Sequence, residues 1–255
     1  MDRHAYLHRI GLRRSPAPDV EGLRVLHRAH LQNVPFENLH IRARIPIELQ
    51  PDRLYDKIVR QRRGGFCYEL NGLFAVLLEE LGFRLDRIQG QVYEARRQRF
   101  GPPFDHMALL VHVEGERYLA DVGFGDLFLE PLPLLLGRKF PDGGRTFTLD
   151  EDEDGHVVLR RANGRSASPM YRFSTAPHAL EDFTGMCRHH QTSPHSHFTQ
   201  RTVCTMALPE GRVTLTDQRT IMTHQSRREE HSIEGDGFRS ALWDHFGMTP
   251  PEALH

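Results

Sequence analysis

The spacing of the apolar residues changes near residue 83, and this change limits what the 255-residue chain can fold into. Between Cys67 and Leu81 apolar side chains recur every three or four positions, which predicts a helix with one buried face that ends at Gly82. From Phe83 onward they tend to recur every second position, which is typical of strands. The sequence therefore predicts a helical first third followed by a remainder rich in strands.

The same patterns predict the other elements. Helices are expected over residues 2–10 and 19–31, and a third helix opens at Pro51, a residue that suits the first helical turn. Further helices are expected at 177–189 and 237–246. Strands are expected at 85–94, 107–113, 117–122, 146–149, 157–160, 171–173, 201–207, 212–216 and 220–224.

Charge and cysteine content exclude several classes of protein. The formal net charge is -1 and no long run of one sign occurs, so we expect neither nucleic acid nor a membrane surface as a partner. Three cysteines argue against a disulfide framework and fit a reducing compartment, so a cytoplasmic location is expected, with no signal peptide or membrane span. The 17 histidines lack zinc-type spacing and no His-Glu-x-x-His pattern occurs, so no metal is expected.

Cys67 directly follows Gly64-Gly65-Phe66 and belongs to the first turn of its predicted helix. Unpaired backbone N–H groups and the positive end of the helix dipole at that place would lower the pKa of the thiol and favour the reactive thiolate. The glycines allow a tight turn and the close approach of another group. Cys67 is therefore a candidate nucleophile, with a buried structural thiol as the alternative.

A candidate base comes from a predicted hairpin over residues 105–125. If its turn is centred on Glu114-Gly115, Asp121 faces Ala108 and lies diagonal to His106 on the same face, roughly 7–8 Å away between backbone positions. A turn shifted by one residue would put Asp121 on the other face. The spacing thus offers a carboxylate that can orient a histidine.

Cys67, His106 and Asp121 would make a nucleophile, a base and an orienting acid. The alternative is that His106 and Asp121 only satisfy each other as buried polar groups. Earlier in the chain, Glu37 lies in an apolar loop over residues 34–39, where its carboxylate could hold Arg62 or Arg63 and so fix the segment before Cys67.

Several segments together resemble the arylamine N-acetyltransferases of the prokaryotic type. The segments are Val34-Pro35-Phe36-Glu37-Asn38-Leu39, Arg63-Gly64-Gly65-Phe66-Cys67-Tyr68-Glu69-Leu70-Asn71, His106 at the head of its strand, Asp121-Val122-Gly123-Phe124-Gly125, and Ser193-Pro194 with Ser196 and Phe198. The resemblance implies an α+β fold of three parts. These are an N-terminal helical bundle (1–82) carrying the nucleophile, a central β-barrel (83–190) carrying the histidine and aspartate, and a C-terminal α/β lid (191–255), with a triad arranged as in cysteine proteases.

The resemblance also implies an activity and roles for individual residues. Acetyl-CoA would be the donor and an arylamine, arylhydrazine or N-hydroxyarylamine the acceptor, in a ping-pong reaction through an acetyl thioester on Cys67, whose N–H is a candidate oxyanion donor. Gly123, Phe124 and Gly125 would lie beside the cofactor, and Phe36 and Phe124 would wall the acceptor pocket. Glu37 would hold Arg63. The assembly is expected to be a monomer or a homodimer.

Two other classes remain open from the residues themselves. A papain-like or transglutaminase-like thiol hydrolase would use the same cysteine, histidine and aspartate. A non-catalytic protein that binds a coenzyme, or a metal through its histidines, would leave Cys67 unreactive.

Overall fold

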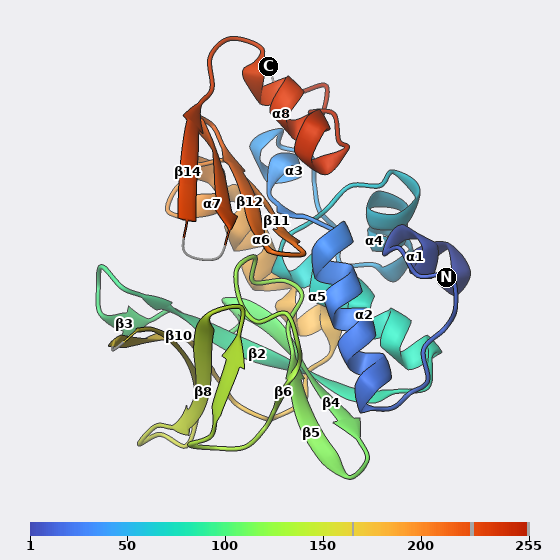
Figure 1. Ribbon diagram of the computed structural model, residues 1–255, viewed down its shortest axis with the longest axis vertical. Helices are drawn as coiled ribbons and strands as arrows, with labels where there is room; N and C mark the ends of the chain where they lie inside the picture. The colour runs from blue at the N-terminus through green and yellow to red at the C-terminus, as the bar shows by residue number, and fades with distance from the viewer. Residues whose placement is uncertain (165, 225–226, 254–255) are drawn as a thin grey trace.

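The computed structural model describes residues 1–164, 166–224 and 227–253. Figure 1 shows three neighbouring parts: helices from the first third of the chain, a strongly curved sheet, and a C-terminal sheet with helix α8 (Gly237–Phe246) against it. This is the mixed helix and sheet fold that the sequence resemblance implies, with helices first, a nearly closed barrel next and an α/β part last.

The N-terminal helices surround α5 (Cys67–Glu80), whose side chains are nearly all buried. They are α1 (Arg3–Arg9), α2 (Val20–Asn33), α3 (Leu39–Arg42), α4 (Pro51–Tyr55) and the π-helical turn η1 (Asp56–Arg60). Asp2 and Asp19 cap α1 and α2 by accepting backbone N–H groups of the first turn. The sequence predicts only one buried face for α5, but α1, α4, β2 and β4 all pack against it, so the helix lies in the main core.

The curved sheet follows in the order β6-β5-β4-β2-β10-β9-β8-β7, with β3 paired to β2. Its strands are β2 (Arg84–Glu94), β3 (Arg99–Phe100), β4 (His106–Val113), β5 (Glu116–Ala120), β6 (Leu132–Pro133), β7 (Lys139–Asp142), β8 (Arg145–Glu151), β9 (Val157–Asn163) and β10 (Ser166–Phe173). In the β4–β5 hairpin Leu109 pairs with Ala120 and Val113 with Glu116, so the predicted register is confirmed. Asp121, the residue after β5, therefore lies at the same end of the hairpin as His106, the first residue of β4.

The C-terminal sheet has the order β1-β11-β12-β13-β14. Its strands are β1 (Phe36–Glu37), β11 (Val203–Leu208), β12 (Gly211–Thr216), β13 (Arg219–His224) and β14 (Arg227–Ser232), and α8 covers one face. A 3-10 turn η2 (Leu180–Phe183), α6 (Thr184–Thr192) and α7 (His197–Gln200) connect it to the curved sheet. Since β1 comes from the predicted loop at 34–39, the start of the chain contributes a strand to its last sheet.

Two of the predicted helices differ from the observed ones. The helix expected from residue 177 begins later, because the His178 N–H bonds to the Arg87 carbonyl oxygen in a bridge to β2 and only a 3-10 turn follows before α6. The helix that opens at Pro51 changes to π geometry after Tyr55. The second difference affects the site, because η1 carries Lys57 into the interior.

Candidate active site

Cys67 is the first residue of α5 and is only 4% exposed. The Glu69 carboxylate accepts the Phe66 N–H at 3.1 Å, which satisfies one of the free donors at the helix start. Gly64 permits this tight entry, since a Cβ there would lie 2.0 Å from the Pro35 carbonyl oxygen. The backbone on either side of the thiol is therefore fixed by short-range contacts.

A buried ion cluster supports the same segment. Lys57 Nζ lies 2.8 Å from Glu69 Oε1 and 3.6 Å from Glu37 Oε1, and Glu37 also accepts the Leu39 N–H at 2.6 Å. Burial acts to raise the pKa of Glu37, but the charges of Lys57 and Arg63 more than offset it and the pKa is lowered. Burial dominates at Glu69, whose pKa is raised although Lys57 opposes the change.

The expected contact between Glu37 and Arg63 needs correction. Among the residues that the structure describes, the ion pair of Glu37 is made by Lys57, while Arg63 Nη1 donates to the Thr249 carbonyl oxygen at 3.0 Å. The reason lies in η1, which buries the Lys57 ammonium so that it requires carboxylate partners. Arg63 acts on Glu37 only through its charge.

His106 and Asp121 meet as the hairpin register predicts, with His106 Nε2 2.8 Å from Asp121 Oδ2. The buried carboxylate also accepts hydrogen bonds from Asn71 Nδ2 at 2.9 Å, the Tyr171 hydroxyl at 3.0 Å and the Gly123 N–H at 3.0 Å. Burial would raise the pKa of Asp121, but His106, Asn71 and Gly123 together lower it, so the group is ionised. Since Nε2–H of His106 donates to this carboxylate, Nδ1 is the nitrogen that can take a proton.

Asn71 ties the helix of Cys67 to the hairpin. It lies one turn after Cys67 on α5, and its Nδ2 also donates to the Met107 carbonyl oxygen at 2.6 Å, while its Oδ1 accepts the Val122 N–H at 2.9 Å. Sequence reasoning assigned Asn71 no role. A signal was available, because a polar residue within a buried apolar stripe requires hydrogen-bond partners in the core.

His27 of α2 contacts Asp121 from the backbone side. The Asp121 N–H donates to His27 Nε2 at 3.0 Å, and His27 Nδ1 lies 2.9 Å from the Leu129 carbonyl oxygen, to which it donates. Burial lowers the pKa of His27 to about 4, so the ring is neutral, as its acceptor role requires. His27 and Tyr171 were both missed, because their distance from Asp121 in the sequence gives no spacing signal.

A cavity of about 430 Å³ lies beside Cys67. Its lining includes Cys67, His106 and three of the residues expected around the substrates, Phe36, Gly123 and Phe124. A Cβ at Gly123 would lie 2.8 Å from Cys67 Cα, so only glycine lets the loop pass this close to the helix. Gly125 instead lies next to Phe36 and Thr205, and the remaining lining residues are Val92, Asp105, His190, His197, Phe198, Arg201, Thr202, Val203 and Thr216.

The pKa of the Cys67 thiol is raised, whereas the position at the helix start predicts a lowered pKa. Burial raises the pKa of Cys67 well above its usual range, neighbouring Cys187 raises it further, and a hydrogen bond to the Met107 backbone opposes the rise. Burial in apolar surroundings disfavours a lone thiolate whatever the helix dipole contributes. A base must therefore remove the proton if Cys67 is to act as a nucleophile.

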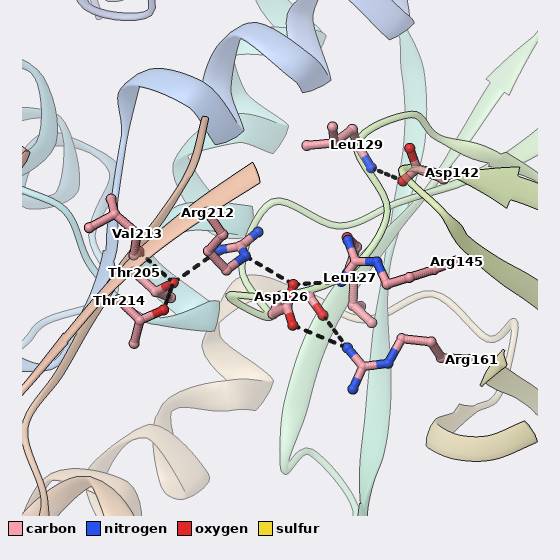
Figure 2. A network of polar contacts seen from close by, with 10 residues as sticks. All are labelled: Asp126, Leu127, Leu129, Asp142, Arg145, Arg161, Thr205, Arg212, Val213 and Thr214. Carbon is pink, nitrogen blue, oxygen red and sulfur yellow. Dashed lines mark hydrogen bonds and ion pairs between the residues drawn. The ribbon is translucent and has the colours of Figure 1, made fainter. Parts of the chain in front are cut away.

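Asp126 holds the other end of the segment 121–126, which begins at Asp121 and forms the first half of the loop between β5 and β6. Figure 2 shows its carboxylate between Arg212 on one side and Arg145 and Arg161 on the other. The N–O distances are 2.6 Å to Arg145, 2.9 Å to Arg212 and 3.2 Å to Arg161. Because Arg212 belongs to β12 while Arg145 and Arg161 belong to β8 and β9, this cluster joins the two sheets beside the cavity loop.

Two further properties of the described residues concern metals and membranes. Within the described residues, the group of side chains close enough together to hold one metal ion consists of Asp152, Asp154 and His156. The carboxylates of Asp152 and Asp154 both form ion pairs with Arg172. They lie outside the lining of the cavity beside Cys67. None of the described helices has the length and apolar character needed to cross a bilayer.

A cysteine at a helix start, in one cavity with a histidine that an aspartate orients, is the arrangement of thiol enzymes that form acyl intermediates. The fold and the cavity thus have the arrangement expected of a thiol-dependent enzyme of the acyl-transfer class.

The comparisons with known proteins specify the class further. A family model described as N-acetyltransferase matches residues 19–250. An arylamine N-acetyltransferase of Mycolicibacterium smegmatis is 36% identical over 236 residues, covering 91% of this chain and 85% of the relative. Among solved structures, the arylamine N-acetyltransferase of Salmonella typhimurium superposes with a TM-score of 0.92 at 31% identity, covering 96% of this chain and 90% of the other. That of Mycobacterium marinum in complex with CoA gives 0.89 at 30% identity, covering 96% and 92%.

The chain belongs to the arylamine N-acetyltransferase family and is an acetyltransferase. This membership agrees with the resemblance found in the sequence, including its relation to bacterial members of the family.

Proposed function

We propose that the protein transfers the acetyl group of acetyl-CoA to arylamines, arylhydrazines and N-hydroxyarylamines through an acetyl thioester on Cys67. The observation that carries this proposal is one cavity lined by both Cys67 and His106, with the His106 ring held by Asp121 at 2.8 Å. The volume of about 430 Å³ lies in the usual range for small-molecule sites and suits an aromatic amine beside Cys67.

In the first half-reaction His106 Nδ1 takes the proton of the Cys67 thiol as the sulfur attacks the thioester carbonyl of acetyl-CoA. The tetrahedral intermediate expels the CoA thiolate, which receives that proton from the imidazolium, and the acetyl group stays on Cys67. The Cys67 N–H at the start of α5 is a donor for the oxyanion. Because burial raises the pKa of Cys67, proton transfer to His106 has to accompany the attack.

In the second half-reaction the nitrogen of the arylamine or arylhydrazine, or the oxygen of the N-hydroxyarylamine, attacks the acetyl thioester and gives up a proton to His106. Cys67 then leaves as a thiolate beside the imidazolium that Asp121 stabilises. Gly123 and Phe124 would lie along the donor, and Phe36 and Phe124 would contact the aromatic ring of the acceptor. Gly125 would help by shaping the loop, and Glu37, Lys57 and Arg63 by fixing the segment around the nucleophile.

Mass spectrometry of the intact protein tests the proposal. After incubation with acetyl-CoA and no acceptor, we expect the wild type to gain one acetyl group and Cys67→Ala to gain none, while an added arylamine removes the group. Cys204→Ala is the matched control, because this other buried thiol belongs to the C-terminal sheet. Steady release of CoA and acetate without an acceptor would identify a thiol hydrolase and overturn the proposal.

We also propose that the enzyme works in the cytoplasm as a monomer or homodimer. All three cysteines are free and buried, which favours a compartment that keeps thiols reduced. Light scattering during gel filtration distinguishes the two assemblies, and location of the tagged protein in cell fractions tests the compartment.

A further inference from the structure

The cavity beside Cys67 contains a second pair of an aspartate and a histidine. Asp105 immediately precedes His106, and His190 comes from α6, with His190 Nε2 3.1 Å from Asp105 Oδ1. Both residues line the cavity together with Cys67 and His106. The reaction described above uses neither of them.

The histidine of this pair is fixed by its own contacts. The Phe198 N–H donates to Ser196 Oγ at 3.3 Å, and Ser196 Oγ lies 3.2 Å from His190 Nδ1. Ser196 Oγ therefore contacts both the Phe198 N–H and Nδ1 of His190, and these contacts fix the position of the ring whose Nε2 faces Asp105. His190 is 5% exposed, so its ring forms a fixed part of the wall.

The carboxylates of Asp105 and Asp121 differ in how many hydrogen bonds they accept from the protein. Asp121 accepts hydrogen bonds from four groups of the protein. Within the described parts of the chain no donor makes a hydrogen bond to the Asp105 carboxylate, because Nε2 of His190 is close to it but not aligned. The Asp105 side chain is 16% exposed, so its spare acceptor capacity is available to a molecule in the cavity.

We infer that Asp105, which lies 3.1 Å from His190 Nε2, determines which acceptors the enzyme prefers. A carboxylate in a cavity that is otherwise largely apolar selects aromatic amines that carry a hydrogen-bond donor, such as an amide or a second amine, away from the reacting nitrogen. It rejects amines that carry a carboxylate there, because the two negative charges would be close together with little water between them. Arg201 also lines the cavity, but it is exposed, so solvent screens its charge.

The inference rests on the proposed function, in which this cavity receives the acceptor after Cys67 is acetylated. The two therefore have to be tested separately, and the half-reactions allow this. Acetylation of Cys67 by acetyl-CoA tests the proposed function alone. Discharge of the acetylated enzyme by different acceptors tests the role of Asp105.

The probes are 4-aminobenzamide and 4-aminobenzoate, which have similar shapes and differ in charge and in the presence of a donor. The measurement is the second-order rate constant with which each probe removes the acetyl group from Cys67, followed by quenched-flow mass spectrometry. We expect the wild type to favour the amide and Asp105→Asn to lower the ratio of amide to benzoate rates about tenfold, as expected for like charges several ångströms apart at a partly solvated site. Asp105→Glu restores the charge and should return the ratio toward that of the wild type.

Asp86→Asn is the matched control. It removes the same charge from another aspartate and histidine pair, Asp86 and His112, which are 2.6 Å apart at the far end of the β2–β4 pairing and outside the cavity lining. Its rate ratio should equal that of the wild type. A purely structural defect in Asp105→Asn would slow both probes equally and leave the ratio unchanged.

The possible outcomes distinguish a failure of the proposed function from a failure of the inference about Asp105. If the wild type forms no acetyl-Cys67, the proposed function fails. If acetyl-Cys67 forms at the normal rate and the rate ratio is the same in wild type and Asp105→Asn, the inference about Asp105 is overturned and the proposed function stands. A change confined to the acetylation step also overturns the inference, because Asp105 would then act on the donor.

Discussion

Asp121 and Asp126, the two ends of the 121–126 segment of the loop between β5 and β6, are stabilised in different ways. Asp121 is 1% exposed and accepts its hydrogen bonds from Asn71, Tyr171, a backbone N–H and one imidazole. The side chain of Asp126 is 48% exposed and contacts three guanidinium groups. The first is a buried charge surrounded by mostly neutral donors, and the second is a half-exposed charge surrounded by cations.

The difference shows what each end of the loop requires. Neutral donors fix the position of a buried carboxylate without cancelling its charge, so Asp121 can still orient His106 and stabilise its protonated form. Three arginines on one aspartate bring a surplus of positive charge, which is tolerable only because water reaches the cluster. Asp121 therefore fixes the orientation of His106, and Asp126 attaches the C-terminal sheet to the curved sheet.

The largest expected effect comes from Asp121→Asn. An amide in this position can no longer hold His106 in the tautomer that leaves Nδ1 free, so we expect the rate of Cys67 acetylation to fall about 10³- to 10⁴-fold. Stopped-flow measurement of CoA release gives this rate, and circular dichroism verifies that the variant is folded.

The same change at the other end of the loop is its control. Asp126→Asn should retain the acetylation rate within about fivefold, because none of the contacts of Asp126 involves Cys67 or His106. Equal losses in the two variants would show that the loop acts as a single unit and would remove the distinction between its ends.

The next effect concerns stability at the Asp121 end. Asn71→Ala leaves the Met107 carbonyl and the Val122 N–H without their partner, and we expect the free energy of unfolding to fall by about 3 kcal/mol. Urea unfolding followed by fluorescence measures it. Asn33→Ala is the control, since Asn33 is exposed and its side chain bonds only to its own helix, so its loss should stay below about 0.5 kcal/mol.

The sequence predicts the parts of the fold that short-range contacts determine. The β4–β5 register follows from its turn, where Glu114 and Gly115 have φ values of 51° and 82°, the left-handed pair that a two-residue hairpin needs. The strand β1 could not be predicted, because its partner β11 lies far away in the sequence and two residues carry no periodic signal. The two-residue strand β6 gives no periodic signal either, and β7 was missed because Pro141 interrupts its four residues.

The candidate site also has contacts that the sequence predicts and contacts that it does not. The contact between His106 and Asp121 is predictable because both residues lie on one hairpin. Lys57 was missed, because its approach to Glu37 and Glu69 depends on a π-helical turn that no pattern in the sequence indicates. The pKa of Cys67 was predicted in the wrong direction, because a local argument includes the helix dipole and omits the burial that the whole fold imposes.

A third prediction uses pH to test the neutral His27 ring, which accepts the Asp121 N–H. Burial lowers the pKa of His27 to about 4, below a value near 6.5 in an unfolded chain, so the unfolded state binds the proton first as the pH falls. The contribution of His27 to stability is complete above about pH 6.5 and decreases toward pH 4, by about 3 kcal/mol in total. His27→Gln keeps an acceptor for the Asp121 N–H and does not titrate. Its unfolding free energy should therefore depend less on pH over this range, and an unchanged slope would contradict the assignment.

The smallest expected effect is the different dependence on salt of the stability that is lost when Asp121 or Asp126 is replaced. Asp126→Asn removes the carboxylate that Arg145, Arg161 and Arg212 share and leaves their mutual repulsion, so we expect a loss of about 1 kcal/mol in the free energy of unfolding at low ionic strength. Because the cluster is partly solvated, salt should screen that repulsion, and most of the loss should be recovered between about 0.05 and 0.5 M NaCl. Any decrease in the free energy of unfolding caused by Asp121→Asn should be nearly independent of salt, because the buried surroundings of Asp121 exclude counterions. Urea titrations of both variants and the wild type at the two salt concentrations measure this, and a loss in Asp126→Asn that salt does not reduce would mean that this end of the loop is also stabilised by its hydrogen bonds.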